Sequence, residues 1–336
     1  MKTRFLGSLK VSEIGMGCMG FSHGYGKVPE ESYAVQAIQK AYDFGCTFFD
    51  TAEGYGKEMF YPGHNEELVG KALAPFRKNV VLATKFHIGS IDNITDMNLY
   101  DEIRKHLENS MKRLKTDYID LYYLHRVNEA VPVEEVAKVM GKLIENGVIR
   151  GWGLSQVSLE TLQKVQEVTP VSAVQNIYSM VERDCENEII PYCMEHKIGV
   201  VPFSPVASGL LSGKVTTETV FEGDDVRKYV PQLSKENLAA NQPILDVLEE
   251  FSKRKNATYA QISLAWMLHK YPNVVPIPGS KNQERILENL GASNVELTAN
   301  DFSELETALD ACTIYGHRGY VESEQNSFGN NWKKMR

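Results

Sequence analysis

Residues 118–125 read Tyr-Ile-Asp-Leu-Tyr-Tyr-Leu-His, and this stretch indicates the fold because nearly every side chain in it is aliphatic or aromatic. A strand that is apolar on both faces is typical of a parallel sheet covered on both sides. Seven further short runs share this character: residues 13–17, 46–50, 80–84, 149–154, 171–177, 199–203 and 274–277. The sequence therefore predicts eight buried strands.

Longer amphipathic stretches separate these runs. In one of them, Ile103, Leu107, Met111 and Leu114 follow at spacings of four, four and three residues, the period of a helix with one buried face. Such patterns occupy residues 30–44, 99–114, 133–146, 158–166, 187–196, 242–255 and 283–290. Strand alternating with helix indicates parallel strands joined by helical crossovers. Eight such units predict an α/β fold, a (β/α)8 TIM barrel in which residues 1–336 form a single domain. Outside these units, we expect an N-terminal hairpin within residues 1–12 and a C-terminal tail over residues 313–336.

Composition narrows the class of protein. A net charge of −8 and the absence of a Lys/Arg-rich run argue against a nucleic-acid partner. The five cysteines are scattered without a C-x-x-C pair, which fits reduced cytosolic thiols better than disulfides or a zinc site. No stretch reaches the ~18 apolar residues of a membrane span. We therefore expect a cytoplasmic protein that binds neither membrane nor nucleic acid.

One motif points to a different fold. Gly15-Met-Gly17-Cys-Met-Gly20 follows a predicted strand and matches G-x-G-x-x-G, the fingerprint of Rossmann dinucleotide sites. That motif must open a helix whose N-terminus meets the pyrophosphate. Residues 21–29 contain two further glycines and end in Pro29, so no helix is expected there. We therefore reject the Rossmann interpretation.

Ionisable side chains end three consecutive predicted strands: Asp50, Lys85 and His125. Tyr55 lies in the loop that follows Asp50. Barrel enzymes carry their chemistry at the C-terminal ends of the strands, so these four side chains are expected to converge. Structure alone gives no reason to gather charge at one rim. The convergence therefore predicts a catalytic site.

The reduction of a carbonyl group accounts for this set. Hydride addition creates an alkoxide, which needs a proton donor, and Tyr55 is the candidate. A neighbouring ammonium, Lys85, should lower the pKa of the phenol, and Asp50 should keep that lysine charged despite burial. A neutral His125 can orient the carbonyl oxygen. No further ligand stands at metal-binding spacing, so no metal is expected.

The blocks at residues 49–56, 83–85 and 122–126 resemble those of the aldo-keto reductase superfamily, and the similarity runs along nearly the whole chain. The resemblance implies Asp50, Tyr55, Lys85 and His125 as the catalytic tetrad of an NADPH-dependent reductase that acts on an aldehyde or ketone. It also implies four groups of cofactor contacts, the first three of which are as follows. The carboxamide contacts are Ser155, Gln156 (where relatives usually have Asn) and Gln175, the ring-stacking block is Phe203, Ser204 and Pro205, and the pyrophosphate cradle is Ser208, Gly209 and Leu210.

The fourth group of implied cofactor contacts, residues 279–289, lies at the start of a predicted helix. Ser280, Lys281 and Arg285 place a hydroxyl and two cations near its N-terminus, where phosphate binds well. The resemblance implies that this is the pocket for the 2′-phosphate of NADPH, with Glu288 and Asn289 on the adenine side. Gly279 stands where some relatives carry another lysine. Residues 216–241, too long for an ordinary connection, are expected to fold over the cofactor.

Two alternatives stay open. A cofactor-binding regulatory subunit could share the fold, and a barrel lyase could use Lys85 as a Schiff-base nucleophile. The intact tetrad and the lack of an extended basic or apolar docking segment favour an enzyme over a regulatory subunit. Asp50, which would keep Lys85 charged, argues against the lyase. The sequence names neither the carbonyl substrate nor the oligomeric state.

Overall fold

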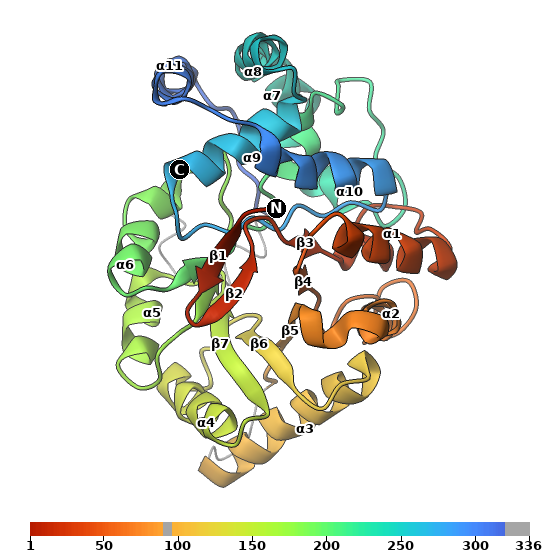
Figure 1. The fold of residues 1–336 in the computed structure, drawn as a ribbon, viewed down its shortest axis with the longest axis vertical. Helices are drawn as coiled ribbons and strands as arrows, with labels where there is room; N and C mark the ends of the chain where they lie inside the picture. Colours follow the sequence, from red (N-terminus) through yellow and green to blue (C-terminus); the bar gives the residue numbers. More distant parts are fainter. Residues whose placement is uncertain (90–95, 320–336) are drawn as a thin grey trace.

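The computed structural model of the chain describes residues 1–89 and 96–319. Within these ranges, seven parallel strands pair in chain order around the centre of the molecule (Figure 1). They are β3 (Met16–Gly17), β4 (Phe48–Asp50), β5 (Val81–Phe86), β6 (Ile119–Leu124), β7 (Ile149–Ser155), β8 (Ala173–Gln175) and β9 (Gly199–Val200). Each of these strands lies within or beside a run that the sequence predicted as a strand.

Residues 274–277 occupy the eighth position and close the barrel. The Val275 amide donates to the Val200 carbonyl at 2.8 Å on one side. On the other side the Gly15 amide donates to the Pro276 carbonyl at 2.9 Å. A proline has no N–H to give, so this segment forms isolated bridges and no continuous ladder. The predicted (β/α)8 barrel is confirmed, with its last strand irregular.

Helices surround the sheet in the described chain (Figure 1). They are α1 (Glu31–Asp43), α2 (His64–Leu73), α3 (Asp96–Leu114), α4 (Val133–Glu145), α5 (Leu159–Gln166), α6 (Ile189–Glu195), α7 (Lys235–Ala240), α8 (Gln242–Lys255), α9 (Tyr259–Lys270), α10 (Gln283–Leu290) and α11 (Ala299–Asp310). The sequence predicted seven of them, with ends correct to within three residues, and missed α2, α7, α9 and α11. The sequence did not predict α9 because this helix is buried on nearly all sides and therefore lacks the one-sided spacing of apolar residues that marks an amphipathic helix.

The N-terminal hairpin closes one end of the barrel. Strands β1 (Thr3–Leu6) and β2 (Leu9–Ser12) pair antiparallel, as predicted. A Cβ added at Gly199, where β9 begins, would lie 2.2 Å from the Leu6 side chain, so Leu6 seals the barrel beneath that strand. The hairpin therefore covers the N-terminal ends of the strands. Access from solvent is left to the opposite end, where barrel enzymes place their sites.

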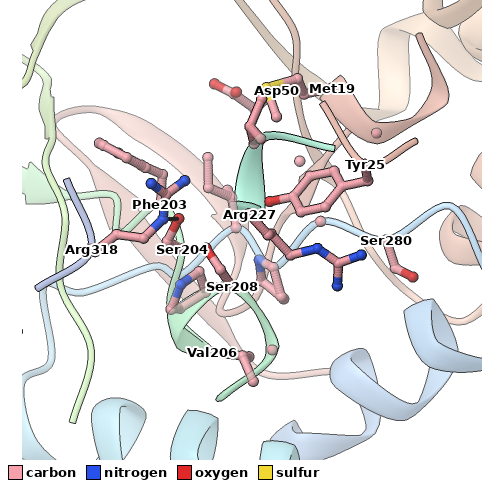
Figure 2. A pocket seen from close by; sticks show the side chains of 18 of the residues that line it. Met19, Tyr25, Asp50, Phe203, Ser204, Val206, Ser208, Arg227, Ser280 and Arg318 are labelled. Carbon is pink, nitrogen blue, oxygen red and sulfur yellow. Dashed lines mark hydrogen bonds between the residues drawn. The ribbon is translucent and has the colours of Figure 1, made fainter. Parts of the chain in front are cut away.

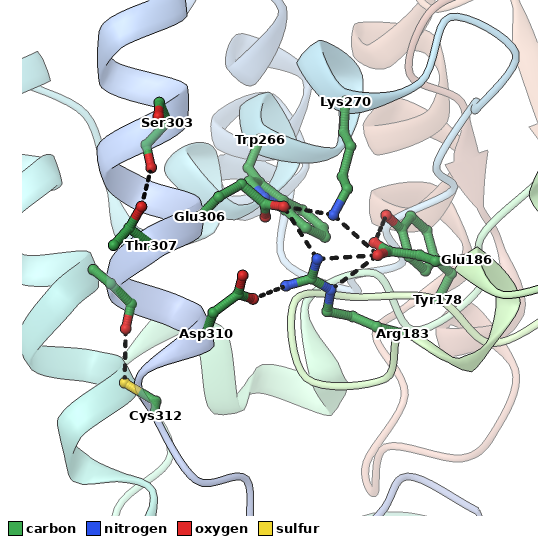
Figure 3. Close-up of polar contacts among 11 residues, drawn as sticks. Tyr178, Arg183, Glu186, Trp266, Lys270, Ser303, Glu306, Thr307, Asp310 and Cys312 are labelled. Carbon is green, nitrogen blue, oxygen red and sulfur yellow. Dashed lines mark hydrogen bonds and ion pairs between the residues drawn. The ribbon is translucent and has the colours of Figure 1, made fainter.

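A half-buried ion-pair network holds α11 in place (Figure 3). Arg183, in the loop after β8, contacts Glu186 at 3.0 Å, Glu306 at 3.1 Å and Asp310 at 3.0 Å. Lys270, at the end of α9, joins the same two glutamates at 3.0 and 2.7 Å. The network fixes α11 against α9. The segment that leaves α11 is thereby directed toward the open end of the barrel.

None of the helices in the described ranges combines the length and the apolar character that crossing a membrane requires.

Candidate active site

A cavity of about 1330 Å³ opens at the C-terminal ends of the strands (Figure 2). Most of the side chains predicted from the sequence line it: Asp50, Tyr55, His125, Ser155, Gln156, Gln175, Phe203, Ser204, Pro205, Ser208, Gly209, Gly279, Ser280, Lys281, Arg285, Glu288 and Asn289. Two predicted residues do not line it. Lys85 lies behind the cavity wall, and the Leu210 side chain is buried in the hydrophobic core. Leu210 can therefore serve a ligand only through its backbone.

Lys85 is fully buried near the end of β5, and its ammonium is held on three sides. It donates to the Asp50 carboxylate, to the Thr51 carbonyl at 2.7 Å and to the Tyr55 hydroxyl at 3.4 Å. These contacts use all three protons of an ammonium. The second oxygen of Asp50 accepts from Gln175 Nε2 at 2.9 Å. The structure thus brings the charged pair directly beneath the Tyr55 phenol.

The electrostatics of this group keep the lysine charged and the tyrosine protonated. Burial is the largest single influence and would lower the pKa of Lys85, but the charges of Asp50 and Tyr55 and the hydrogen bonds to both together outweigh it, so the pKa is raised. Burial raises the pKa of Tyr55 by more than Lys85 lowers it. The sequence argument expected the phenol to be a stronger acid than usual. In the free chain it is weaker, because the desolvation of a buried phenolate exceeds the attraction of the ammonium.

His125 follows β6, and its backbone amide donates to the Phe86 carbonyl at 2.9 Å. Its ring meets the Tyr55 ring edge-on, with centroids 5.7 Å apart. Burial, and then the charge of Arg126, bring the pKa of His125 well below its ordinary value. The ring is therefore neutral, as predicted. A neutral imidazole beside Tyr55 can donate one hydrogen bond to a carbonyl oxygen in the cavity.

A charged lysine with no exposed surface is a poor Schiff-base nucleophile. Lys85 has an accessibility of 0%, and its three protons are engaged. Forming a Schiff base requires a neutral amine that reaches the substrate carbonyl. The structure therefore disfavours the lyase alternative.

The predicted carboxamide contacts come together at the ends of β7 and β8. Gln156 has a positive φ of 56°, and its side-chain oxygen accepts from the Ile177 amide at 3.2 Å. The Ser155 hydroxyl accepts from Arg126 at 3.0 Å. With Gln175 bonded to Asp50, each of these polar side chains has a protein partner and also borders the cavity. They form a polar wall beside the Phe203 ring.

The segment after Phe203 is shaped to hold an anion. Ser208 and Gly209 have positive φ values of 54° and 104°, and a Cβ at Gly209 would lie 2.9 Å from Val215. The Ser208 hydroxyl is buried and has no hydrogen-bond partner within residues 1–89 and 96–319. An unpartnered buried donor at a cavity wall is costly unless a ligand pairs with it. This observation fits a phosphate of the predicted cofactor.

The segment before α10 lies on the opposite side of the cavity from Phe203 (Figure 2). The Lys281 ammonium turns away to the 21–27 loop and donates to the Tyr25 carbonyl at 2.6 Å. Glu288 pairs with Lys214 at 3.0 Å. No carboxylate of the described chain contacts the guanidinium of Arg285, which is exposed at the rim. Arg285 is thus the better placed of the two predicted cations to meet a phosphate.

Two loops meet across the mouth of the cavity. The Gly24 amide donates to an Asp224 carboxylate oxygen at 2.5 Å, and the Val226 amide donates to the Gly24 carbonyl at 3.1 Å. The Arg227 guanidinium lies 5.3 Å from the centre of the Tyr25 ring (Figure 2). Residues from the long 216–241 segment therefore border the cavity, as expected from its length.

Sequence reasoning also missed two arginines that line the cavity. Arg126 was noted only as part of a motif, and Arg318 belongs to the segment after α11. The Arg318 side chain donates to the Ser204 hydroxyl at 2.8 Å. Arg126 could have been found from its position directly after His125, the predicted catalytic histidine. In residues 1–89 and 96–319, no group of three or more His, Cys, Asp or Glu side chains could hold a metal ion.

Comparison with known proteins places this site in context. The family model of the aldo/keto reductases matches residues 13–310. A probable aldo-keto reductase 1 of Glycine max is 38% identical over 315 residues, covering 93% of this chain and 89% of the relative. The aldo-keto reductase yakc of Schizosaccharomyces pombe, whose name specifies NADP(+), is 36% identical and is covered over 94% of both chains.

Solved structures of aldo-keto reductases and of a glycerol dehydrogenase have the same fold as this chain. The glycerol dehydrogenase of Gluconobacter oxydans superposes with a TM-score of 0.81 at 27% identity, over 93% of this chain and 95% of that one. An aldo/keto reductase of Klebsiella pneumoniae, solved with NADP and acetate, gives a TM-score of 0.72 at 26% identity, over 95% of this chain and 99% of that one.

Proposed function

Because the chain belongs to the aldo/keto reductase family, whose members use NADPH, we propose that it reduces an aldehyde or ketone to an alcohol with Tyr55 as the proton donor. The observation that carries the proposal is the placement of the Tyr55 hydroxyl. It borders the cavity, lies 3.4 Å from the Lys85 ammonium and faces the neutral ring of His125. A proton donor, a cation behind it and a neutral hydrogen-bond donor beside it are what carbonyl reduction requires.

The cofactor, when bound, supplies the hydride that adds to the carbonyl carbon. Tyr55 gives its proton to the carbonyl oxygen as negative charge develops there, so that the product is a neutral alcohol. Lys85 stabilises the phenolate that remains, and Asp50 keeps Lys85 charged throughout. His125 directs the carbonyl oxygen toward Tyr55 by a hydrogen bond.

Other side chains of the cavity would hold the cofactor. Ser208 and Gly209 offer a hydroxyl and an open backbone to the pyrophosphate, and Arg285 offers a charge to the 2′-phosphate. Phe203 provides a ring face on which the nicotinamide can stack. The contact between the 23–26 loop and residues 224–227 would exclude water from the bound cofactor.

Replacement of Tyr55 by Phe tests the proposal. The variant should keep NADPH affinity, measured by quenching of Trp fluorescence, while the rate of aldehyde reduction falls about 10²–10⁴-fold, the usual scale of general acid catalysis. Tyr192→Phe is the matched control, because this ring lies on α6 outside the cavity, and it should leave the rate unchanged. A Tyr55→Phe protein that reduces aldehydes as fast as the wild type would refute the assignment.

A further inference from the structure

Arg126 places a cation on the wall of the cavity that Tyr55 also borders. The residue follows His125 at the end of β6, and its side chain folds back so that the guanidinium donates to the His125 carbonyl at 2.5 Å. The same nitrogen donates to the Ser155 hydroxyl, at the end of β7, at 3.0 Å. The His125 ring meets the Tyr55 ring edge-on, with centroids 5.7 Å apart. Two adjacent strand ends therefore hold the guanidinium close to the side chains that carry the proposed chemistry.

No carboxylate within residues 1–89 and 96–319 contacts this guanidinium, and its hydrogen bonds go to neutral oxygens. Asp50, the acid nearest to Tyr55, is held by Lys85 and Gln175. Burial has the largest effect on the pKa of Arg126 and lowers it, whereas Tyr55 raises it. A further cation, that of Arg318, lowers the pKa again. The acid that acts on this cation is thus the phenol of Tyr55.

The phenolate that remains after proton transfer is poorly balanced by Lys85 alone. Burial has the largest effect on the pKa of Tyr55 and raises it. Lys85 lowers this pKa, but Asp50, which is paired with that lysine, raises it, so that the two charges partly cancel at the phenol. Arg126 also lowers the pKa of Tyr55, and no paired carboxylate opposes it. Its charge therefore reaches the phenol without such a cancellation.

The other ionisable groups around Tyr55 do not supply a buried positive charge. The pKa of His125 lies well below its ordinary value and that of His23, whose ring centroid is 5.4 Å from that of Tyr55, is also lowered, in both cases chiefly by burial. Both rings are therefore neutral. Lys57 and Glu58, on the loop of Tyr55 itself, are exposed and lie 3.8 Å apart.

We propose that Arg126 is a positioning residue of the reaction, whose charge stabilises, together with that of Lys85, the phenolate that Tyr55 becomes when it gives its proton to the carbonyl oxygen. The proposal rests on the reductase function proposed above. The O–H bond of Tyr55 breaks, a new O–H bond forms on the substrate oxygen, and the negative charge stays on the phenol oxygen, where both cations attract it. A guanidinium does not lose its proton in a protein, so this charge is constant over the working range of pH.

The test measures the acidity of the phenol at position 55 directly, without cofactor or substrate. Tyr55 is replaced by 3,5-difluorotyrosine, whose fluorine atoms make the phenol more acidic and report its ionisation by 19F NMR. In Arg126→Gln the pKa of this phenol should rise by about one unit or more, the lower end of the effect of a nearby opposite charge. Arg126→Met, a second neutral variant that keeps the apolar stem, should give the same shift. Arg126→Lys keeps the charge, so the pKa should stay near the wild-type value.

The rate of reduction gives an independent measurement. 4-Nitrobenzaldehyde is neutral, so a change of charge at Arg126 should affect its binding little. A weaker acid transfers its proton more slowly, so kcat with NADPH should fall about three- to tenfold in Arg126→Gln while KM for the aldehyde stays nearly unchanged. In Arg126→Lys the value of kcat should return toward that of the wild type.

Arg104→Gln is the matched control, because it removes a positive charge from α3, outside the cavity, and it should change neither the pKa of the phenol nor kcat. A pKa that moves in neither neutral variant of Arg126 would overturn the proposal. A pKa that moves as far in Arg126→Lys as in Arg126→Gln would overturn it too, since the loss would then come from the shape of the side chain. If the wild type reduces no aldehyde at all, the reductase function fails, and a raised pKa in Arg126→Gln still supports the action of Arg126 on Tyr55.

Discussion

Replacement of Lys85 by Met tests how much the buried ammonium contributes to the stability of the fold and how much to the rate of carbonyl reduction. The side chain has 0% accessibility, and its ammonium contacts Asp50, Thr51 and Tyr55. Removing one partner of a buried ion pair typically destabilises a protein by about 3–5 kcal/mol, because the other charge is left uncompensated. An unfolding entropy of roughly 2.1 cal/mol/K per residue gives about 0.7 kcal/mol/K for this chain length, so Tm should fall by about 4–7 °C.

The double variant Asp50→Asn, Lys85→Met tests the cause. It removes the stranded carboxylate as well, so Tm should recover by more than half of the loss, measured by calorimetry without cofactor. The rate of carbonyl reduction should stay at least about 10²-fold below wild type in both variants, because neither has a cation beneath the Tyr55 phenol. Stability and activity should thus respond differently to the second substitution.

Lys255→Met is the matched control. This lysine is also ion-paired, to Asp301, but lies outside the cavity. It should lower Tm without lowering kcat. A Lys85→Met protein with wild-type kcat, or a double variant no more stable than the single one, would refute the reasoning.

Two further predictions follow from the contacts of single side chains. Arg285→Ala should weaken NADPH binding about tenfold or more and leave NADH binding nearly unchanged, whereas Lys281→Ala should have a smaller effect because its ammonium is bound to the Tyr25 carbonyl. Trp fluorescence quenching measures both, and equal losses for the two cofactors would exclude a role in reading the 2′-phosphate. His106 lies 2.8 Å from Glu53, whose hydrogen bond raises the pKa of the imidazole above its unfolded value. The stability that this pair contributes is therefore complete below about pH 6.5 and is lost as the pH rises through the folded pKa. In urea unfolding, His106→Gln should lower the free energy of unfolding more at pH 5.5 than at pH 9. An equal loss at both pH values would show that the charge of His106 is not involved.

The sequence by itself determined the architecture and predicted which ionisable side chains meet at one rim of the barrel. Short apolar runs alternating with amphipathic stretches encode parallel strands and crossovers, since both periods are local properties of the chain. Asp50, Lys85 and His125 could be placed at one rim because parallel strands of a barrel end on the same side. That inference needed no knowledge of which residues pack together.

Tertiary structure decided the interactions between distant segments. Only the packed chain shows that Lys281 is bound by the 21–27 loop, that burial raises the pKa of Tyr55, and that Arg318 returns from the tail to the cavity wall. Only the packed chain, too, reveals α9, whose burial on nearly all sides erases its period. Desolvation and charge pairing depend on the neighbours in space, and a sequence pattern reports only the neighbours along the chain.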